Sequence, residues 1–421
     1  NMIMSFLQSS IILLAFLQLA VQLLLKNKNE KKIKSLQECP PEDVQIIMDH
    51  ENWKKTSNYS LDKSRLSNWE EILGFLIFIP TFLFFFPWYF ASWDTSAETS
   101  LWSCAVSVCT FFLILQFPSL PLEWYRQFVL EEKYGFNKST LKLWLSDKLK
   151  GVVLSFVIGV PLLGLLIFLF REISIVLPNS WWILSFCIFF LIQLILMVLW
   201  PKIFLPLFNK LTPLDDGSLK DRLQALADRS GFKAKTIEVI DGSKRSGHSN
   251  AFFTGFGKFR RIVLYDTLLE QMEETEIEAV LAHEVGHYRK GHIPQRLVIS
   301  FASGLGIFAL IAYALQSEWI YHSLNLTEDL VGSLSSILVF LSISLGYFTY
   351  WLSPFSNLLS RKHEFEADSF AKDSIGSEEP LIQALRKLYK ENLTHPLPHA
   401  WIAAFHFSHP TIIERERALR A

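Results

Sequence analysis

Uncharged apolar runs recur along the chain and alternate with polar segments that carry almost all of its Lys, Arg, Asp and Glu residues. A helix of about 20 residues rises 1.5 Å per residue and so crosses a hydrocarbon core of roughly 30 Å. The pattern therefore predicts seven membrane-spanning helices, at 2–25, 72–93, 101–117, 152–170, 181–200, 297–316 and 332–353.

The first apolar run, 2–25, could also be a secretory signal peptide. It has no basic segment before it and no small-residue cleavage site, and the sequence KNKNEKK follows directly from Lys26. A basic flank of this kind is expected after a membrane helix. We therefore interpret the run as the first span.

Basic residues alternate between the two sets of short connections. Residues 26–70 contain nine Lys or Arg and residues 118–151 contain six, whereas 94–100 and 317–331 contain none and 171–180 contains one. Because cytosolic loops carry the excess of Lys and Arg, the N-terminus is predicted to be outside or lumenal and the C-terminus cytosolic.

The two largest polar segments, 201–296 and 354–421, then share the cytosolic side. The first of them predicts a surface helix at 214–231 and short strands at 236–240 and 261–265, from their polar and β-branched patterns.

A Gly- and Ser-rich segment separates the two predicted strands, and residues 249–254 within it could form an edge strand. Such a strand can bind an extended peptide through main-chain hydrogen bonds. An ordinary hairpin explains the pattern equally well.

Candidate chemistry centres on Glu276 to His292, where apolar residues recur at helical spacing. His283 and His287 are four residues apart and so project from one face of that helix. This is the HExxH zinc pattern, and Glu284 is its candidate general base.

A catalytic zinc site usually has three protein ligands and one open position. The segment 361–371 offers Glu364 and Asp368 at a spacing of four, on a second predicted helix. Both metal segments adjoin a membrane span on the cytosolic side, so the predicted site lies at the membrane boundary.

Composition narrows the classes of function. Half of the residues are apolar and 36 are Phe, which fits a membrane protein. The net charge is −1, so no nucleic-acid partner is expected. Three of the four Cys lie within apolar runs, so the Cys residues are interpreted as packing residues rather than a disulfide framework.

Other His and Arg residues are less clear from spacing. His409 could stabilise an oxyanion, but a His at a helix start and a surface Arg415 are favoured by spacing alone. His292 and His363 are interpreted as structural residues rather than ligands. The role of His248 is undecided.

A different class of protein is a membrane transporter or scaffold with structural zinc. Structural sites normally have a fourth protein ligand, and no candidate stands at suitable spacing. A structural zinc site would also give Glu284 no catalytic role.

Several separate stretches resemble the CAAX prenyl protease 1 family of integral-membrane zinc metallopeptidases, in the same order. They include the HExxH motif and EEKYGFNKSTLKLWLSDKLK from Glu131, DGSKRSGHSNAFFTGF from Asp241, RIVLYDTLL from Arg261, EFEAD from Glu364 and HPTIIER from His409.

The resemblance implies roles for matching residues. His283, His287 and Glu364 would bind one zinc ion, and Glu284 would be catalytic. The remaining matches are Asp368 as the partner of a ligand His, Asn250 as a holder of the substrate backbone, and His409 and Arg415 near the reaction centre. The family more often has EFQAD, so Glu366 is a departure, and we expect it to face away from the metal.

The family fold is seven helices around an intramembrane chamber, closed by a cytosolic α+β zinc metalloprotease domain. We expect a five-helix membrane region at 1–200 and a metallopeptidase domain at 201–421 that includes the last two spans.

In eukaryotes the family removes the last three residues of CAAX sequences after prenylation, so a prenylated protein substrate and the lipid bilayer are the implied partners. The stretch HEVGHYRKGH is more similar to bacterial members, for which membrane-protein quality control is the alternative. The location would be the cytoplasmic membrane in a bacterium and the endoplasmic reticulum in a eukaryote.

Overall fold

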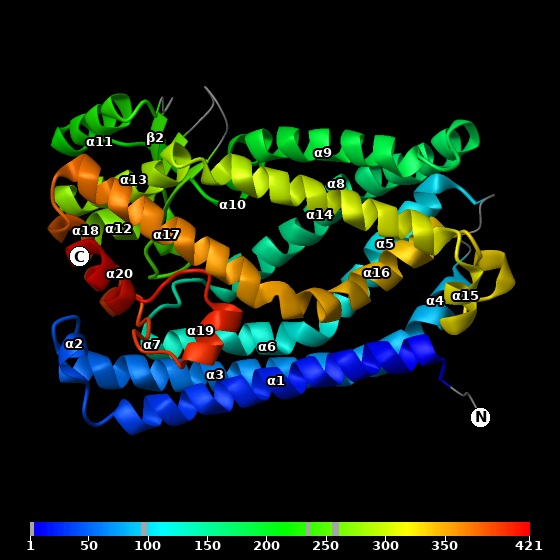
Figure 1. Ribbon diagram of the computed structural model, residues 1–421, viewed down its shortest axis with the longest axis horizontal. Coiled ribbons are helices and arrows are strands. Elements are labelled where there is room, and N and C mark those ends of the chain that lie inside the picture. Colours follow the sequence, from blue (N-terminus) through cyan, green and yellow to red (C-terminus); the bar gives the residue numbers. More distant parts are fainter. Residues whose placement is uncertain (1–3, 94–98, 233–235, 255–260) are drawn as a thin grey trace.

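The structure is a computed structural model that describes residues 4–93, 99–232, 236–254 and 261–421. Long helices run lengthwise through the molecule, and short helices and a small sheet gather at the end that carries the C-terminus (Figure 1). The N-terminus lies at the opposite end.

The first half of the chain is helical. Its helices are α1 (Phe6–Leu36), α2 (Glu42–Gln45), α3 (His50–Pro80), α4 (Phe86–Ser92), α5 (Leu101–Gln116), α6 (Leu120–Tyr125), α7 (Glu132–Tyr134), α8 (Leu141–Val176), α9 (Trp181–Leu199) and α10 (Leu205–Phe208). Single π or 3-10 turns join α3 to α4, α5 to α6, α6 to α7 and α9 to α10, so these pairs form longer rods.

The second half mixes strands and helices. Its elements are β1 (Leu211–Pro213), α11 (Ser218–Arg229), β2 (Thr236–Ile240), β3 (Ala251–Thr254), β4 (Arg261–Tyr265), α12 (Asp266–Gln271), α13 (Glu274–Arg289), α14 (His292–Leu315), α15 (Glu318–Ser323), α16 (Leu334–Thr349), α17 (Ser353–Ile375), α18 (Glu379–Glu391), α19 (Ala400–His406) and α20 (Ile412–Arg420).

Seven helical segments of the described chain are long and apolar enough to cross a membrane, and each overlaps one predicted span. They are Phe6–Leu36, His50–Ser92, Leu101–Tyr134, Leu141–Val176, Trp181–Phe208, His292–Leu315 and Leu334–Ile375. Most of these helices are longer than the apolar runs. Lys, Glu and Arg are good helix formers, so the helix continues into the polar residues beside each run.

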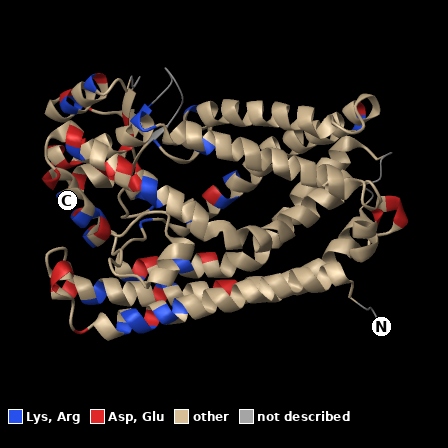
Figure 2. Ribbon diagram, viewed as in Figure 1, with Lys and Arg blue, Asp and Glu red and all other residues tan. Residues whose placement is uncertain are grey.

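Large apolar side chains remain exposed along these helices, among them Phe84, Val157, Leu191 and Ile299. Contiguous exposed apolar surface is rare on soluble proteins and is expected where lipid covers it. Charged residues concentrate at the C-terminal end of the molecule and leave most of the helical length uncharged (Figure 2). The molecule is therefore built as a multi-pass membrane protein.

Two large apolar cores and one small cluster are buried among the described residues. One lies among the long helices and is rich in Phe, including Phe82, Phe86 and Phe111. The other lies around α13 and the sheet and includes Val285, Ile262 and Leu223. The second core fixes the helix that carries the HExxH residues.

The described strands form one sheet in the order β1-β2-β4-β3. β2 and β4 are parallel, from Thr236 opposite Arg261, whereas β3 pairs antiparallel with β4. β3 is thus both the hairpin partner of β4 and the edge strand, and it begins at Ala251 rather than at residue 249. The predicted surface helix and both predicted strands are confirmed.

Candidate active site

The metal-binding candidates come from two helices that approach each other very closely. α13 packs on α17, and a Cβ atom added at Gly286 would lie 2.9 Å from the Cα and carbonyl oxygen of Ala367. Ala367 is fully buried. Since glycine has no side chain, the two backbones can touch here, and this contact brings the HExxH face of α13 opposite Glu364.

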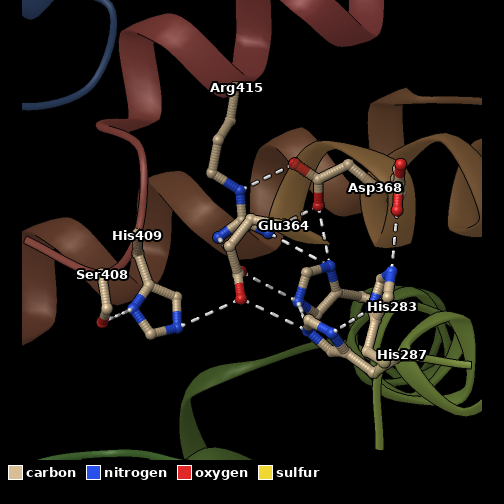
Figure 3. Close-up of polar contacts among 9 residues, drawn as sticks. His283, His287, Glu364, Asp368, Ser408, His409 and Arg415 are labelled. Atoms are coloured by element: carbon tan, nitrogen blue, oxygen red, sulfur yellow. Dashed lines mark hydrogen bonds and ion pairs between the residues drawn. The ribbon is translucent and has the colours of Figure 1, made fainter. Parts of the chain in front are cut away.

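Three ligand atoms converge at this contact, one each from His283, His287 and Glu364, and all lie within 4.8 Å of one another. The two His Nε2 atoms are 3.3 Å apart, and each is also 3.3 Å from a Glu364 oxygen. Figure 3 shows Glu364 facing both rings. Glu364 Oε2 is buried without a hydrogen-bond partner among the described residues, as expected of an atom that binds a metal.

Asp368 contacts His283 at Nδ1, the ring nitrogen that does not face Glu364. Its Oδ1 lies 2.8 Å from His283 Nδ1, and Arg415 donates to both of its oxygens, from Nε at 2.8 Å and from Nη2 at 2.5 Å. Burial alone would lower the pKa of His283, but the neighbouring carboxylates of Asp368 and Glu364 outweigh burial and raise it to about 9. Because Asp368 Oδ1 can accept only from a protonated Nδ1, this contact favours the tautomer in which Nε2 is free for a metal.

Glu284 opens onto a cleft of about 580 Å³ that His287, Glu364 and His409 also line. Burial raises the pKa of the Glu284 carboxyl, although His283 and His287 oppose the shift. A carboxyl group with a raised pKa can both accept and return a proton near neutral pH. Its position and its pKa both suit the general base expected from the sequence.

His409 stands on the opposite side of Glu364 from the two ligand histidines (Figure 3). Its Nε2 is 3.4 Å from Glu364 Oε1, its Nδ1 is 2.9 Å from Ser408 Oγ, and its side chain is 63% exposed. The ring is thus available to a molecule in the cleft.

Arg415, in contrast, is buried behind Asp368 and is not among the residues that line the cleft. The resemblance implied a place near the reaction centre for this residue. In the structure it orients Asp368, and its Nη2 also lies 3.2 Å from His283 Nδ1. A catalytic role for Arg415 stays a prediction.

Asn250 lies just before edge strand β3 and is exposed. Its side-chain oxygen accepts from the Ala251 amide at 2.8 Å, and its carbonyl accepts from the Tyr265 amide at 3.1 Å. β3 lies beside α13. Substrate binding by Asn250 stays a prediction.

His248, which the sequence left undecided, joins the loop around Phe136 to the segment before β3. Its ring stacks on Phe136 at 4.0 Å, with ring nitrogens 3.2 Å from Asn392 Oδ1 and 3.3 Å from Glu131 Oε2. This places it in a structural junction.

Sequence reasoning missed one contact of the site. His292 was interpreted as structural, and its Nδ1 lies 2.9 Å from Nδ1 of the ligand candidate His287. Glu366 stands outside the ligand group, as expected, but its Oε2 is 2.9 Å from His292 Nε2. The contact depends on the turn at Gly291, whose φ of +74° suits glycine, and a turn direction is hard to read from spacing.

Comparisons with known proteins agree along most of the chain. Residues 29–210 match the family described as CAAX prenyl protease N-terminal, five membrane helices, and residues 213–421 match peptidase family M48. CAAX prenyl protease 1 of Saccharomyces cerevisiae is 36% identical over 90% of this chain and 88% of its own length. The Homo sapiens CAAX prenyl protease 1 homolog is 30% identical over 94% and 91%.

A solved structure, the crystal structure of S. mikatae Ste24p, superposes with a TM-score of 0.87 at 33% identity and covers 98% of both chains. The relatives named here are eukaryotic, so they lend no support to the expected bacterial origin. The chain belongs to the CAAX prenyl protease 1 family within peptidase family M48, and it is a multi-pass membrane metalloendopeptidase.

Proposed function

We propose that this protein is a zinc endopeptidase that cuts prenylated CAAX-type proteins near their C-termini. The observation that carries the proposal is the convergence of His283, His287 and Glu364 beside a cleft that also exposes Glu284. The names of the relatives support the CAAX substrate class.

Zinc suits the three ligands better than a hard cation does. Two imidazoles and one carboxylate are a common catalytic zinc set, with a fourth position left for water or substrate. A tetrahedral ion about 2.0–2.1 Å from each ligand separates the ligand atoms by about 3.3–3.4 Å. The two His Nε2 atoms, 3.3 Å apart, agree with that separation. Each of them also lies 3.3 Å from a Glu364 oxygen, His283 from Oε2 and His287 from Oε1, so the carboxylate is within reach of the same ion.

The catalytic residues divide the reaction between them. Zinc, when bound, would polarise the scissile carbonyl and lower the pKa of a nearby water molecule. Glu284 takes a proton from the water as its oxygen attacks the carbonyl carbon. His409 donates a hydrogen bond to the oxyanion, and Glu284 then returns the proton to the leaving amine as the C–N bond breaks.

The edge strand β3 would hold the substrate in an extended conformation beside this machinery. β3 offers a free strand edge in the described sheet, and Asn250 stands at its start. Main-chain pairing of this kind gives affinity with little dependence on the side chains of the substrate.

We further propose that the site faces the cytosol and that the N-terminus is outside or lumenal. The concentration of charged residues at the site end of the molecule and the excess of Lys and Arg in its short loops support this orientation (Figure 2). The division near residue 200 is supported by the two family matches, which meet between residues 210 and 213.

A mostly apolar cavity would help the protein to accept a lipidated peptide. It has a volume of about 430 Å³, and its lining includes Phe78, Leu115 and Ile343 together with the carboxylates of Glu70 and Glu123. The predicted intramembrane chamber would extend this apolar environment along the helices.

Cleavage of a matched pair of CAAX peptides, one farnesylated and one unmodified, tests the proposal. We expect the purified protein to release the last three residues, and we expect a zinc chelator to abolish the release. The ratio of the two rates measures how much the lipid contributes. Cleavage only of unfolded membrane-protein fragments would favour a quality-control protease, and zinc content without any cleavage would favour a structural zinc site.

Replacing Asp368 by Asn should weaken zinc binding by about 10- to 100-fold, because His283 loses the carboxylate that fixes its tautomer. The buried Arg415 would also lose the closer of its two carboxylate partners, so the protein should be less stable. Titration of chelator-stripped protein with zinc measures the first effect. Asp373→Asn, at an exposed position of the same helix, is the matched control, and equal affinities for the two variants would contradict the assignment.

A further inference from the structure

The ligand candidate His287 contacts His292, and His292 in turn contacts Glu366. His287 Nδ1 lies 2.9 Å from His292 Nδ1, and His292 Nε2 lies 2.9 Å from Glu366 Oε2. His292 is 1% exposed and Glu366 is partly exposed. The chain therefore runs from the metal site through a buried ring to a carboxylate.

One arrangement of protons satisfies every contact in this chain. If His287 uses Nε2 for zinc, its Nδ1 carries the proton and donates to the lone pair of His292 Nδ1. The other nitrogen of His292, Nε2, is then protonated and donates to Glu366. Each atom has one partner and no donor faces another donor.

The surrounding structure holds His292 in this position. Gly291, in the left-handed conformation, turns the chain sharply between α13 and α14 and sets His292 at the first position of α14. His363 stacks on the His292 ring at 4.0 Å with an interplanar angle of 11°, and its own Nε2 lies 2.9 Å from Gln295 Oε1. The His292 ring is thus held by stacking on one face and by a contact at each of its two nitrogens.

We propose that His292 and Glu366 are positioning residues that fix the tautomer and orientation of His287, as Asp368 does for His283. The inference rests on the proposed zinc site. Partners of this kind raise the basicity of a ligand imidazole, and their loss typically weakens metal binding by 10- to 100-fold. The two ligand histidines would then each be supported by a carboxylate, one directly and one through a second ring.

A second metal site at His292, His363 and Glu366 is the competing explanation, since one ligand atom from each also lies within 4.8 Å of the others. The ring geometry argues against it. A metal lies in the plane of each imidazole that binds it, and two nearly parallel rings 4.0 Å apart have no such common point. Both nitrogens of His292 are also already in use.

Zinc titration of full-length, chelator-stripped protein tests the inference with four variants. His292→Ala and Glu366→Ala should each weaken zinc binding, with about a 10- to 100-fold loss for His292→Ala. Glu366→Gln keeps an acceptor oxygen for His292 and should restore most of the affinity. Lys362→Met removes an exposed ammonium group 3.7 Å from Glu366 and should bind zinc as the unchanged protein does.

Two further readouts separate positioning from a general structural role. The visible spectrum of the cobalt-substituted protein should change in His292→Ala and Glu366→Ala, because ligand orientation sets that spectrum. The thermal midpoint of the metal-free protein should stay close to the original in Glu366→Ala, since the Glu366 side chain is 37% exposed.

Three results would overturn the inference. Zinc affinities within about twofold of the original for both alanine variants would show that His292 and Glu366 do not position His287. Two zinc ions per chain, with one lost in His292→Ala, would establish the second metal site instead. Absence of zinc binding by the unchanged protein would overturn the proposed zinc site, and the inference with it.

Discussion

Replacing Glu284 by Gln should lower the rate of peptide cleavage by about 10²- to 10⁴-fold while the protein keeps its zinc. Gln has nearly the same shape but cannot take a proton from water. Glu284 lies beside the ligand group without belonging to it, so the substitution leaves all three ligands in place. Single-turnover cleavage of a CAAX peptide, together with the zinc content of the same sample, measures both parts of the prediction.

The burial of Glu284 is a second reason to expect a loss of activity in Glu284→Gln. Burial disfavours the carboxylate form of Glu284 and raises its pKa, so the variant removes a group that binds a proton more readily than an exposed carboxyl does. Glu270→Gln makes the same change at an exposed position on α12 and should cleave normally. If Glu284→Gln retained more than about a tenth of the original rate, well short of the usual contribution of a general base, another group would have to take the proton.

The sequence predicts best what a single helix determines by itself. His283 and His287, and likewise Glu364 and Asp368, are four residues apart, and the helical period places each pair on one face without any knowledge of the fold. The seven spans follow in the same way from local hydropathy. The ends of these helices do not, because residues 26–36 are mostly polar and still continue α1.

Contacts between elements are harder to predict. Arg415 reaches Asp368 from α20, and only the packing of α20 against α17 shows that it stands behind the ligands instead of in the cleft. His292 is five residues from His287, a spacing that a continuous helix would place on different faces. The turn at Gly291 breaks the helix and brings the two rings together.

Replacing Gly286 by Ala should destabilise the protein by about 1–3 kcal/mol and lower catalytic efficiency by about 10²-fold, with loss of zinc affinity. The added Cβ would meet backbone atoms of Ala367 at 2.9 Å, and a backbone cannot rotate away as a flexible side chain can. α13 and α17 would have to separate. Thermal unfolding and zinc titration of the purified variant measure the two effects.

The position of the clash explains why one methyl group should matter so much. Gly286 stands between His283 and His287 on α13, and Ala367 stands between Glu364 and Asp368 on α17. Any separation at this point lengthens the distances from Glu364 to both histidines and the bond from Asp368 to His283 at once. Gly286→Ala should therefore lose metal and activity together, in contrast to Glu284→Gln, which should lose activity alone.

Gly306→Ala is the matched control for the methyl group itself. A Cβ at Gly306, within α14, would meet nothing within 4 Å, and Ala is favoured over Gly in a helix by about 1 kcal/mol. This variant should be at least as stable as the original and fully active. Gly286→Ala could instead bind zinc as tightly as Gly306→Ala. In that case the two helices would accommodate the methyl group without moving the ligands, and the close approach of α13 and α17 would not be what holds the ligands together.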